Sequence, residues 1–546
     1  MRYLLLFLAL LPPSFAFAQQ TEFTRQDTLR GTLSPLRSCY DVTFYDLNLR
    51  IRPEEKTIAG HNVIHFEAQQ PFSRLQVDLF GNLSLDSILD ASGNKLTFER
   101  EGNATFVDFA EEVAEGTQTQ FTVFYHGKPR IAPRPPWDGG FTWQKDQYDR
   151  HWIGVSCEGL GASVWWPNKD HLSDEPDSMR IYLEVPEELY AVANGNLRSI
   201  TRLTNDQKGY EWFVNAPINN YNVTVNIAHY RKFSEDFESI SGETVDLDYF
   251  VLDYNIEKAR EHFKQVKPML RCFEQLFGAY PFPEDGYALV ETPYWGMEHQ
   301  GAIAYGNNYR NLENWDFDFI IVHESGHEYF GNSISVRDHA EMWIHEAFTT
   351  YAEALYLECL HDLEKATDYL MTQRKNIRNS VAILGPLGVN FNDWPGADMY
   401  YKGTWMLHTL RHAVNDDELW KKAIFDFHDK NRLSHMNTEE VIAFFEQATG
   451  KALAPIFYEY LRYTDVPTLE YELETKGDKV KLRYRWKVNE PGFALPVYVR
   501  FSPGGKWHRL EARADKWQKA KFKGMEVEQF ELDPRRAYAQ VRRVED

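Results

Sequence analysis

The sequence has few cysteines, little positive charge and no internal repeat or low-complexity tract. With 59 Lys and Arg against 81 Asp and Glu, its formal charge is −22, which argues against nucleic acid as a partner because phosphates require a basic surface. The four cysteines are widely separated and form no C-x-x-C pair, which excludes a cysteine zinc site and a disulfide-framework protein. One or two disulfides remain possible among Cys39, Cys157, Cys272 and Cys359.

The sequence also has no apolar run of membrane-spanning length. Its longest apolar run lies near the N-terminus and predicts a secretory signal over residues 1–18. Arg2 precedes a leucine-rich run that two prolines interrupt, and an Ala-Phe-Ala segment then supplies small residues for cleavage. The run is shorter than the ~20 residues needed to span a bilayer. We therefore expect an exported protein, periplasmic or secreted, without stable insertion into a membrane.

The rest of the chain is long enough for several domains. The whole chain of 546 residues includes 43% hydrophobic and 15% aromatic residues, which is ample for packed cores. Apolar residues alternate through much of residues 19–232, which predicts a large antiparallel β domain. Helical spacing dominates residues 233–466, and alternation returns in residues 467–546. The predicted order is a β domain, a mainly helical domain and a small β domain.

Two helices are marked individually. Residues 255–277 have apolar side chains at helical spacing. Further on, Asn437 fits an N-cap, Glu440 lies at the third helical position, and Gly450 can close the helix.

A metal-binding pattern lies in the central segment, which reads His323-Glu324-Ser325-Gly326-His327. Residues four apart lie on one face of a helix, so both imidazoles can reach one cation, and imidazole suits zinc. Glu324 points to the same side and can take the proton of an attacking water. The apolar residues 319–322 before the motif predict that this helix is buried. The alternative is a structural helix with two packed histidines.

A third ligand is expected from Glu346, which follows His327 by nineteen positions in a segment that itself looks helical. A catalytic zinc keeps three protein ligands and one open position. The pattern therefore predicts one Zn²⁺ per chain, held by His323, His327 and Glu346.

HESGHEYFGN followed by Glu346 resembles the aminopeptidase N and leukotriene hydrolase family of zinc peptidases. The resemblance runs from YDVTFYDLNLRIRPEEKTIAG to the last predicted strands. It implies an α+β multidomain fold with a saddle-like N-terminal β domain, a thermolysin-like catalytic domain and a small C-terminal β sandwich. Because about eighty residues follow Leu469, we expect the large C-terminal helical domain of many relatives to be absent.

The segment from Tyr294 to Gly301 resembles the GxMEN exopeptidase motif of that family, with His299 where asparagine is usual. The resemblance implies that Glu298 pairs with the free α-ammonium of a peptide. The backbone of Gly296 and Met297 would lie along the peptide as an edge. Such an ion pair would bring only the first peptide bond to the metal.

The segment Asp398–Gly403 resembles the Tyr-x-Lys-Gly segment of the family. In that register Tyr400 would donate its phenol to the oxyanion of the tetrahedral intermediate. Tyr401 is the alternative if the register slips by one residue.

Two further residues are expected at the site by the same resemblance. Glu158, in Ser156-Cys157-Glu158-Gly159, would be a second anchor for the amine; otherwise it is an ordinary carboxylate at a strand end. Glu353, seven residues after Glu346, would orient a zinc histidine; otherwise it is a solvated glutamate.

The expected function is a zinc aminopeptidase that acts on peptides with free N-termini, using metal-activated water and a glutamate base. A thermolysin-like endopeptidase is disfavoured because the Glu298 loop would block passage of the chain. An epoxide hydrolase or transferase activity belongs to one branch of the family, and nothing in this sequence singles it out. A catalytically inactive peptide-binding protein would require a lost ligand or base, yet all of these residues are in place.

Overall fold

The computed structural model describes residues 22–204, 206–392, 394–477, 479–514, 516–524 and 527–544. The expected signal over residues 1–18 lies outside these ranges. Within them, no helix is both long enough and apolar enough to cross a membrane.

The N-terminal part consists of two short helices, α1 (Arg25–Gly31) and α2 (Pro35–Ser38), followed by two β-sheets. The larger sheet has ten strands in the order β12-β13-β10-β1-β2-β7-β4-β5-β6-β3. Its strands are β1 (Tyr40–Arg52), β2 (Thr57–Ala68), β3 (Phe72–Asp78), β4 (Leu83–Asp90), β5 (Lys95–Glu101), β6 (Ala104–Val113), β7 (Gln118–Gly127), β10 (Ser178–Pro186), β12 (Asn196–Arg202) and β13 (Gln207–Val214).

These strands form because apolar residues alternate along them, and the alternate residues are buried, as β10 shows over its whole length. One pairing differs from the expected antiparallel sheet, since β1 and β10 run parallel. The smaller sheet has the order β11-β14-β9-β8. Its strands are β8 (Gly140–Lys145), β9 (His151–Ser156), β11 (Tyr190–Ala193) and β14 (Val225–Ala228).

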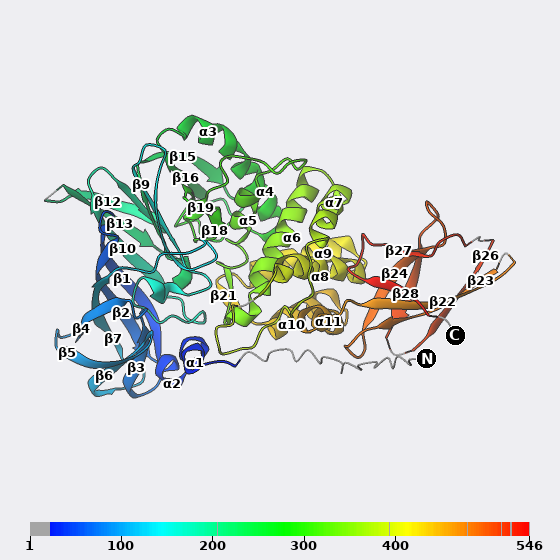
Figure 1. Cartoon of the computed structure of the whole chain (residues 1–546), viewed down its shortest axis with the longest axis horizontal. Coiled ribbons are helices and arrows are strands. Elements are labelled where there is room, and N and C mark those ends of the chain that lie inside the picture. The colour runs from blue at the N-terminus through cyan, green and yellow to red at the C-terminus, as the bar shows by residue number, and fades with distance from the viewer. Residues whose placement is uncertain are drawn as a thin grey trace, which may run out of the picture.

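Among the residues that the structure describes, a five-stranded sheet and nine α-helices form the middle of the molecule, between the N-terminal sheets and the C-terminal strands (Figure 1). The sheet order is β15-β16-β17-β19-β18, which leaves β18 at one edge. The strands are β15 (Tyr230–Glu238), β16 (Thr244–Leu252), β17 (Tyr287–Glu291), β18 (Gly296–Met297) and β19 (Ile303–Tyr305). The helices are α3 (Ile256–His262), α4 (Val266–Phe277), α5 (Phe319–Gly326), α6 (Trp343–Leu360), α7 (Leu363–Arg374), α8 (Asp398–Val414), α9 (Asp417–Lys430), α10 (Thr438–Thr449) and α11 (Ala454–Arg462).

Two features of this region differ from the sequence pattern. The helix expected over residues 255–277 is divided into α3 and α4 by a 3-10 turn at Phe263–Gln265, next to Pro268, which has no N–H to donate. Strand β15 also crosses residue 233, where the catalytic domain was expected to begin, and it pairs with β16. That domain boundary stays a prediction.

Helix α6 lies at the centre of the helical core, because its residues 343 to 357 are all buried. It contacts α5, α7 and α8. A disulfide joins Cys272 of α4 to Cys359 of α6, which are 87 residues apart in sequence, and this settles a pairing that the sequence left open. Cys39 and Cys157 are buried free thiols.

The C-terminal part contains two further sheets, ordered β26-β23-β22-β28 and β25-β24-β27. It lies at the end of the molecule opposite the ten-stranded sheet (Figure 1), and the expected multidomain α+β architecture is confirmed. The strands are β22 (Thr468–Lys476), β23 (Lys479–Lys487), β24 (Ala494–Arg500), β25 (His508–Arg513), β26 (Gln518–Lys523), β27 (Glu531–Leu532) and β28 (Gln540–Arg543). In the middle region, β20 (Ile334–Val336) and β21 (Ser434–Met436) form a separate parallel pair.

Candidate metal centre

Helix α5 presents the two histidines of the metal-binding motif to one side. Asp318 caps its N-terminus by accepting a hydrogen bond from the backbone N–H of Ile320 at 2.9 Å. The helix ends at Gly326, and His327 continues its right-handed backbone as the C-cap, with its N–H bonded to the carbonyl of His323. The i, i+4 spacing therefore holds through the last turn, and both rings lie over the same face.

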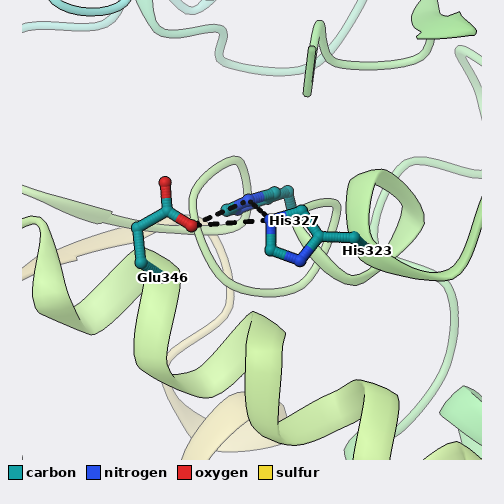
Figure 2. A group of neighbouring side chains, drawn as sticks. All are labelled: His323, His327 and Glu346. Atoms are coloured by element: carbon teal, nitrogen blue, oxygen red, sulfur yellow. Dashed lines mark hydrogen bonds and ion pairs between the residues drawn. The ribbon is translucent and has the colours of Figure 1, made fainter. Parts of the chain in front are cut away.

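Figure 2 shows the two imidazoles and the Glu346 carboxylate turned toward one another from two helices. The two Nε2 atoms are 3.3 Å apart. They lie 3.6 Å (His323) and 3.5 Å (His327) from Oε2 of Glu346. All three side chains are buried, and their ligand atoms lie within 4.8 Å of one another.

These residues fit a zinc ion. Tetrahedral ligand atoms that lie about 2.0–2.1 Å from zinc are about 3.3 Å from one another, close to the separations found here. Oε2 of Glu346 is a buried oxygen that forms no hydrogen bond within the described residues, and a cation would satisfy it. Burial raises the pKa of Glu346, but His327 and His323 together hold it below its ordinary value, so the carboxylate is ionised. One zinc per chain is the cofactor that this donor set accepts.

The outer nitrogens of both rings have partners. Nδ1 of His323 lies 2.7 Å from Oε1 of Glu353, which is the contact expected for that residue, and Glu353 is fully buried rather than solvated. Nδ1 of His327 lies 2.9 Å from the carbonyl oxygen of Phe330. Since carbonyl and carboxylate oxygens only accept, both rings donate from Nδ1 and turn a bare Nε2 toward the metal position.

Glu353 is itself held by two side chains that the sequence did not single out. Its Oε2 accepts hydrogen bonds from the Tyr369 hydroxyl and from Nε2 of Gln373, the latter at 3.1 Å. Both donors lie on α7, which packs beside α6. The carboxylate is thereby fixed in the direction that orients the His323 ring.

Glu324 lies between the metal position and the edge strand β18. A Cβ atom on Gly296 would approach Oε1 of Glu324 to 2.4 Å, so only glycine allows this strand to come so close. Burial, together with the carboxylates of Glu298 and Glu346, raises the pKa of Glu324 to about 7, against the opposing effect of the two histidines.

Glu298 follows β18 and points into the same space. A carboxylate oxygen of Glu298, one of Glu324 and a ring nitrogen of His327 lie within 4.8 Å of one another. The Tyr221 hydroxyl donates to Oε1 of Glu298 at 3.1 Å, and Nδ2 of Asn332 donates to its backbone oxygen at 2.9 Å. Both the side chain and the backbone of Glu298 are therefore fixed.

His299, the departure from the family motif, is fully buried beneath this loop. Its N–H donates to the carbonyl of Met297, and its own carbonyl accepts from Ala302, both at 2.9 Å, so the backbone forms a tight turn. Neither ring nitrogen has a hydrogen-bond partner among the described residues, and burial lowers the pKa of His299 to about 3. The ring is neutral and does not reach the Glu298 carboxylate.

Glu158 lies just beyond the end of β9 and lines the same cavity as Glu298. Burial and the neighbouring carboxylates of Glu298 and Glu346 raise its pKa well above the ordinary value. The structure thus brings two carboxylates to the end of the cavity where an amine anchor was expected.

Tyr400 and Tyr401 both lie in the first turn of α8 and line the cavity. The Tyr400 ring stacks 6.0 Å from the His323 ring, and burial next to Glu346 raises the pKa of its phenol well above the ordinary value. Tyr401 instead lies near Glu353, on the far side of His323 from the metal position. Tyr400 is thus the tyrosine nearer the three ligands.

The cavity has a volume of about 560 Å³ and receives side chains from the N-terminal part as well as from the helical middle region. Three tryptophans in its wall come from separate segments; Trp295 stands in the segment that resembles the GxMEN motif, and the sequence did not reveal the other two. They are Trp137, Trp295 and Trp394.

Comparisons with known proteins agree with this geometry. Residues 261–460 match the peptidase family M1 domain. Rat aminopeptidase B is 25% identical over 263 residues, which cover 43% of this chain and 40% of the relative. Aminopeptidase N of Lactobacillus helveticus is 22% identical over 224 residues, covering 37% of this chain and 26% of the relative. The chain spans less than half the length of these curated relatives.

Solved structures show the same fold. An M1 zinc metallopeptidase mutant from Deinococcus radiodurans, bound to a Tyr-Ser-Ala substrate, aligns with a TM-score of 0.66 at 20% identity. The alignment covers 79% of this chain and 96% of that one. The matched segment, the zinc-ligand pattern and the fold agree, and residues 261–460 of this chain form a domain of the peptidase family M1 type.

Proposed function

We propose that this chain is a zinc-dependent aminopeptidase that removes the N-terminal residue from peptides. The observation that carries the proposal is the position of Glu298, whose carboxylate lies within 4.8 Å of ligand atoms of His327 and Glu324. A peptide ammonium paired with Glu298 would have only its first carbonyl near the three metal ligands. A site that places only one residue between the amine anchor and the metal ligands distinguishes an aminopeptidase from an endopeptidase.

His323, His327 and Glu346 would hold the zinc. When bound, zinc supplies a Lewis acid that polarises a carbonyl and makes water more acidic. The carboxylate of Glu353 keeps the His323 ring in the tautomer and orientation that binding requires.

Glu324 is the general base of the proposal. Its buried carboxylate lies close to the Gly296 backbone and beside the metal position, so it takes a proton from the attacking water and delivers it to the leaving amine. Tyr400 approaches from α8 and donates its phenolic hydrogen to the oxygen on which negative charge develops.

The substrate amine would lie between Glu298 and Glu158. An ammonium beside these carboxylates lowers the cost of burying them, since each loses solvation in the cavity and gains an opposite charge. The backbone of β18 has no strand partner on its outer side, so Gly296 and Met297 can pair with an extended peptide.

The proposal includes export. The disulfide between α4 and α6 is typical of proteins that fold in an oxidising compartment, which agrees with the secretory signal expected from the sequence.

The test uses purified full-length chain with a peptide, its N-acetylated counterpart and mass spectrometry of the products. We expect stepwise release of single N-terminal residues from the free peptide, none from the acetylated one, loss of activity with a chelator and recovery with zinc. Internal cleavage of the acetylated peptide at a comparable rate would identify an endopeptidase instead.

A further inference from the structure

Basic side chains lie on the outer face of strands β23 and β26, in the sheet β26-β23-β22-β28. This sheet is at the end of the molecule away from the N-terminal sheets (Figure 1). In β23 the even-numbered residues 480–486 are buried, and the alternate residues are all basic and point outward. Strand β26 repeats the pattern with exposed lysines. We call these eight residues the basic face: Lys479, Lys481, Arg483, Arg485, Lys487, Lys519, Lys521 and Lys523.

The register of β23 and β26 sets like charges against each other. Three cross-strand partners in succession are both basic, namely Lys479 with Lys523, Lys481 with Lys521, and Arg483 with Lys519. Like charges directly opposite each other on one face of a sheet destabilise the pairing. The arrangement therefore costs stability unless an anion lies against it.

Carboxylates within the sheet neutralise only part of the basic face. The three glutamates of β22 pair with residues of β23, at 2.8 Å for Glu470 with Arg485, 2.6 Å for Glu472 with Arg483, and 3.2 Å for Glu474 with Lys481. None of the three β26 lysines forms an ion pair with a described residue. The edge strand keeps its full positive charge.

The charge of this region is opposite to that of the rest of the chain. Residues 467–546 contain 18 Lys and Arg against 13 Asp and Glu, a formal charge of +5, whereas the whole chain has −22. The preceding residues therefore carry −27, and the molecule has a basic end and an acidic body. Such a distribution orients a protein in the field of a charged surface.

We propose that the basic face binds the protein peripherally to an anionic lipid bilayer through lysine contacts with phosphate-bearing headgroups. A planar surface can touch the distal sheet while the acidic body stays away from it. A long nucleic acid would extend over that body and be repelled. The cavity of the metal centre is lined by no described residue of 467–546, so the bound enzyme would keep an open active site.

Protection of the sheet edge does not account for the whole pattern. Lysines on an edge strand such as β26 oppose edge-to-edge pairing with another molecule. Strand β23, however, lies inside the sheet with partners on both sides, and it carries five of the eight basic residues. A ligand bound to this surface accounts for the basic residues of both β23 and β26.

The test measures sedimentation of the full-length enzyme with vesicles of phosphatidylcholine alone or with about 30% phosphatidylglycerol. We expect binding only to the anionic vesicles, and its loss between about 0.05 and 0.5 M NaCl as the charges are screened. Replacing Lys519, Lys521 and Lys523 together by glutamine should weaken binding roughly 100-fold, since each lysine near an anionic surface contributes about a factor of five. Replacement by arginine should preserve it.

A matched control replaces three exposed lysines of the N-terminal part, Lys56, Lys95 and Lys128, by glutamine and should bind as the wild type does. Peptidase activity should be unchanged in both triple variants, and the β26 variant should unfold at the same or a higher temperature because like-charge pairs are removed. Equal loss of binding in the control would show a general charge effect and overturn the proposal. So would tighter binding to duplex DNA than to vesicles, or competition by inorganic phosphate at constant ionic strength. If the wild type does not bind vesicles and the glutamine variant self-associates, the lysines serve to prevent edge-to-edge pairing of β26, and the proposal is wrong.

Discussion

Replacing Glu298 by glutamine tests the amine anchor most directly, because the change removes the charge and keeps the shape. The residue is 4% exposed, so an ammonium paired with its carboxylate would be largely out of water. Removing one partner of a buried, hydrogen-bonded charge pair costs about 2–5 kcal/mol. A misplaced reacting carbonyl costs on the order of 10²-fold in rate. We therefore expect kcat/KM for a free peptide to fall at least roughly 100-fold in Glu298→Gln.

The assay compares a substrate that begins with phenylalanine with its des-amino analogue, which has 3-phenylpropanoyl in place of phenylalanyl. The wild type should strongly prefer the amine, and Glu298→Gln should lose most of that preference. The analogue should change by less than about a factor of three, which makes the interaction energy between mutation and amine large. Zinc content is measured in parallel, because Glu298 lies close to His327.

Tyr221→Phe is the matched control for this prediction. It removes the hydroxyl that donates to Glu298 and leaves the carboxylate in place. Loss of one hydrogen bond to a charged group costs about 1.5–3 kcal/mol, so a decrease of roughly 10- to 100-fold is expected, with the preference for the amine kept because the carboxylate remains. If Glu298→Gln slows the des-amino substrate as much as the amine, Glu298 acts on the fold or the metal, and the reasoning is refuted.

Three other substitutions test the remaining roles. Glu324→Gln should lower kcat by about 10²–10⁴-fold with zinc still bound, as measured by steady-state kinetics and metal analysis; near-normal turnover would move the base to another residue. Tyr400→Phe should lower kcat on the order of 10²–10³-fold with little change in substrate binding, whereas a silent Tyr400→Phe beside a damaging Tyr401→Phe would shift the register by one. Glu353→Gln should weaken zinc affinity about 10–100-fold in a chelator titration, and unchanged affinity would reduce Glu353 to a packing role.

The sequence determined the features that depend on neighbours along the chain. The i, i+4 spacing of His323 and His327 needs only one helix to bring both rings to one side. The N-cap Asn437 and Glu440 predict a helix, and α10 begins there with both capping hydrogen bonds and ends at Gly450, whose φ is +65°. Capping and spacing are local, so the residues alone specify them.

Short strands carried too little pattern to be predicted. Strand β18 has two residues and β19 has three, yet they place Glu298 beside the metal ligands. Two or three residues cannot show an alternation, and these strands exist because β17 provides a buried partner for β19. The position of the amine anchor could be inferred only from resemblance until the sheet was known.

Contacts between distant segments were decided by the tertiary structure alone. The disulfide between α4 and α6 and the parallel pairing of β1 with β10 each join residues whose separation in sequence carries no signal. The basic residues of β23 and β26 likewise read as two separate alternating runs. Only the register that pairs these strands puts lysine opposite lysine, because the facing of two strands depends on long-range hydrogen bonds and not on either segment by itself.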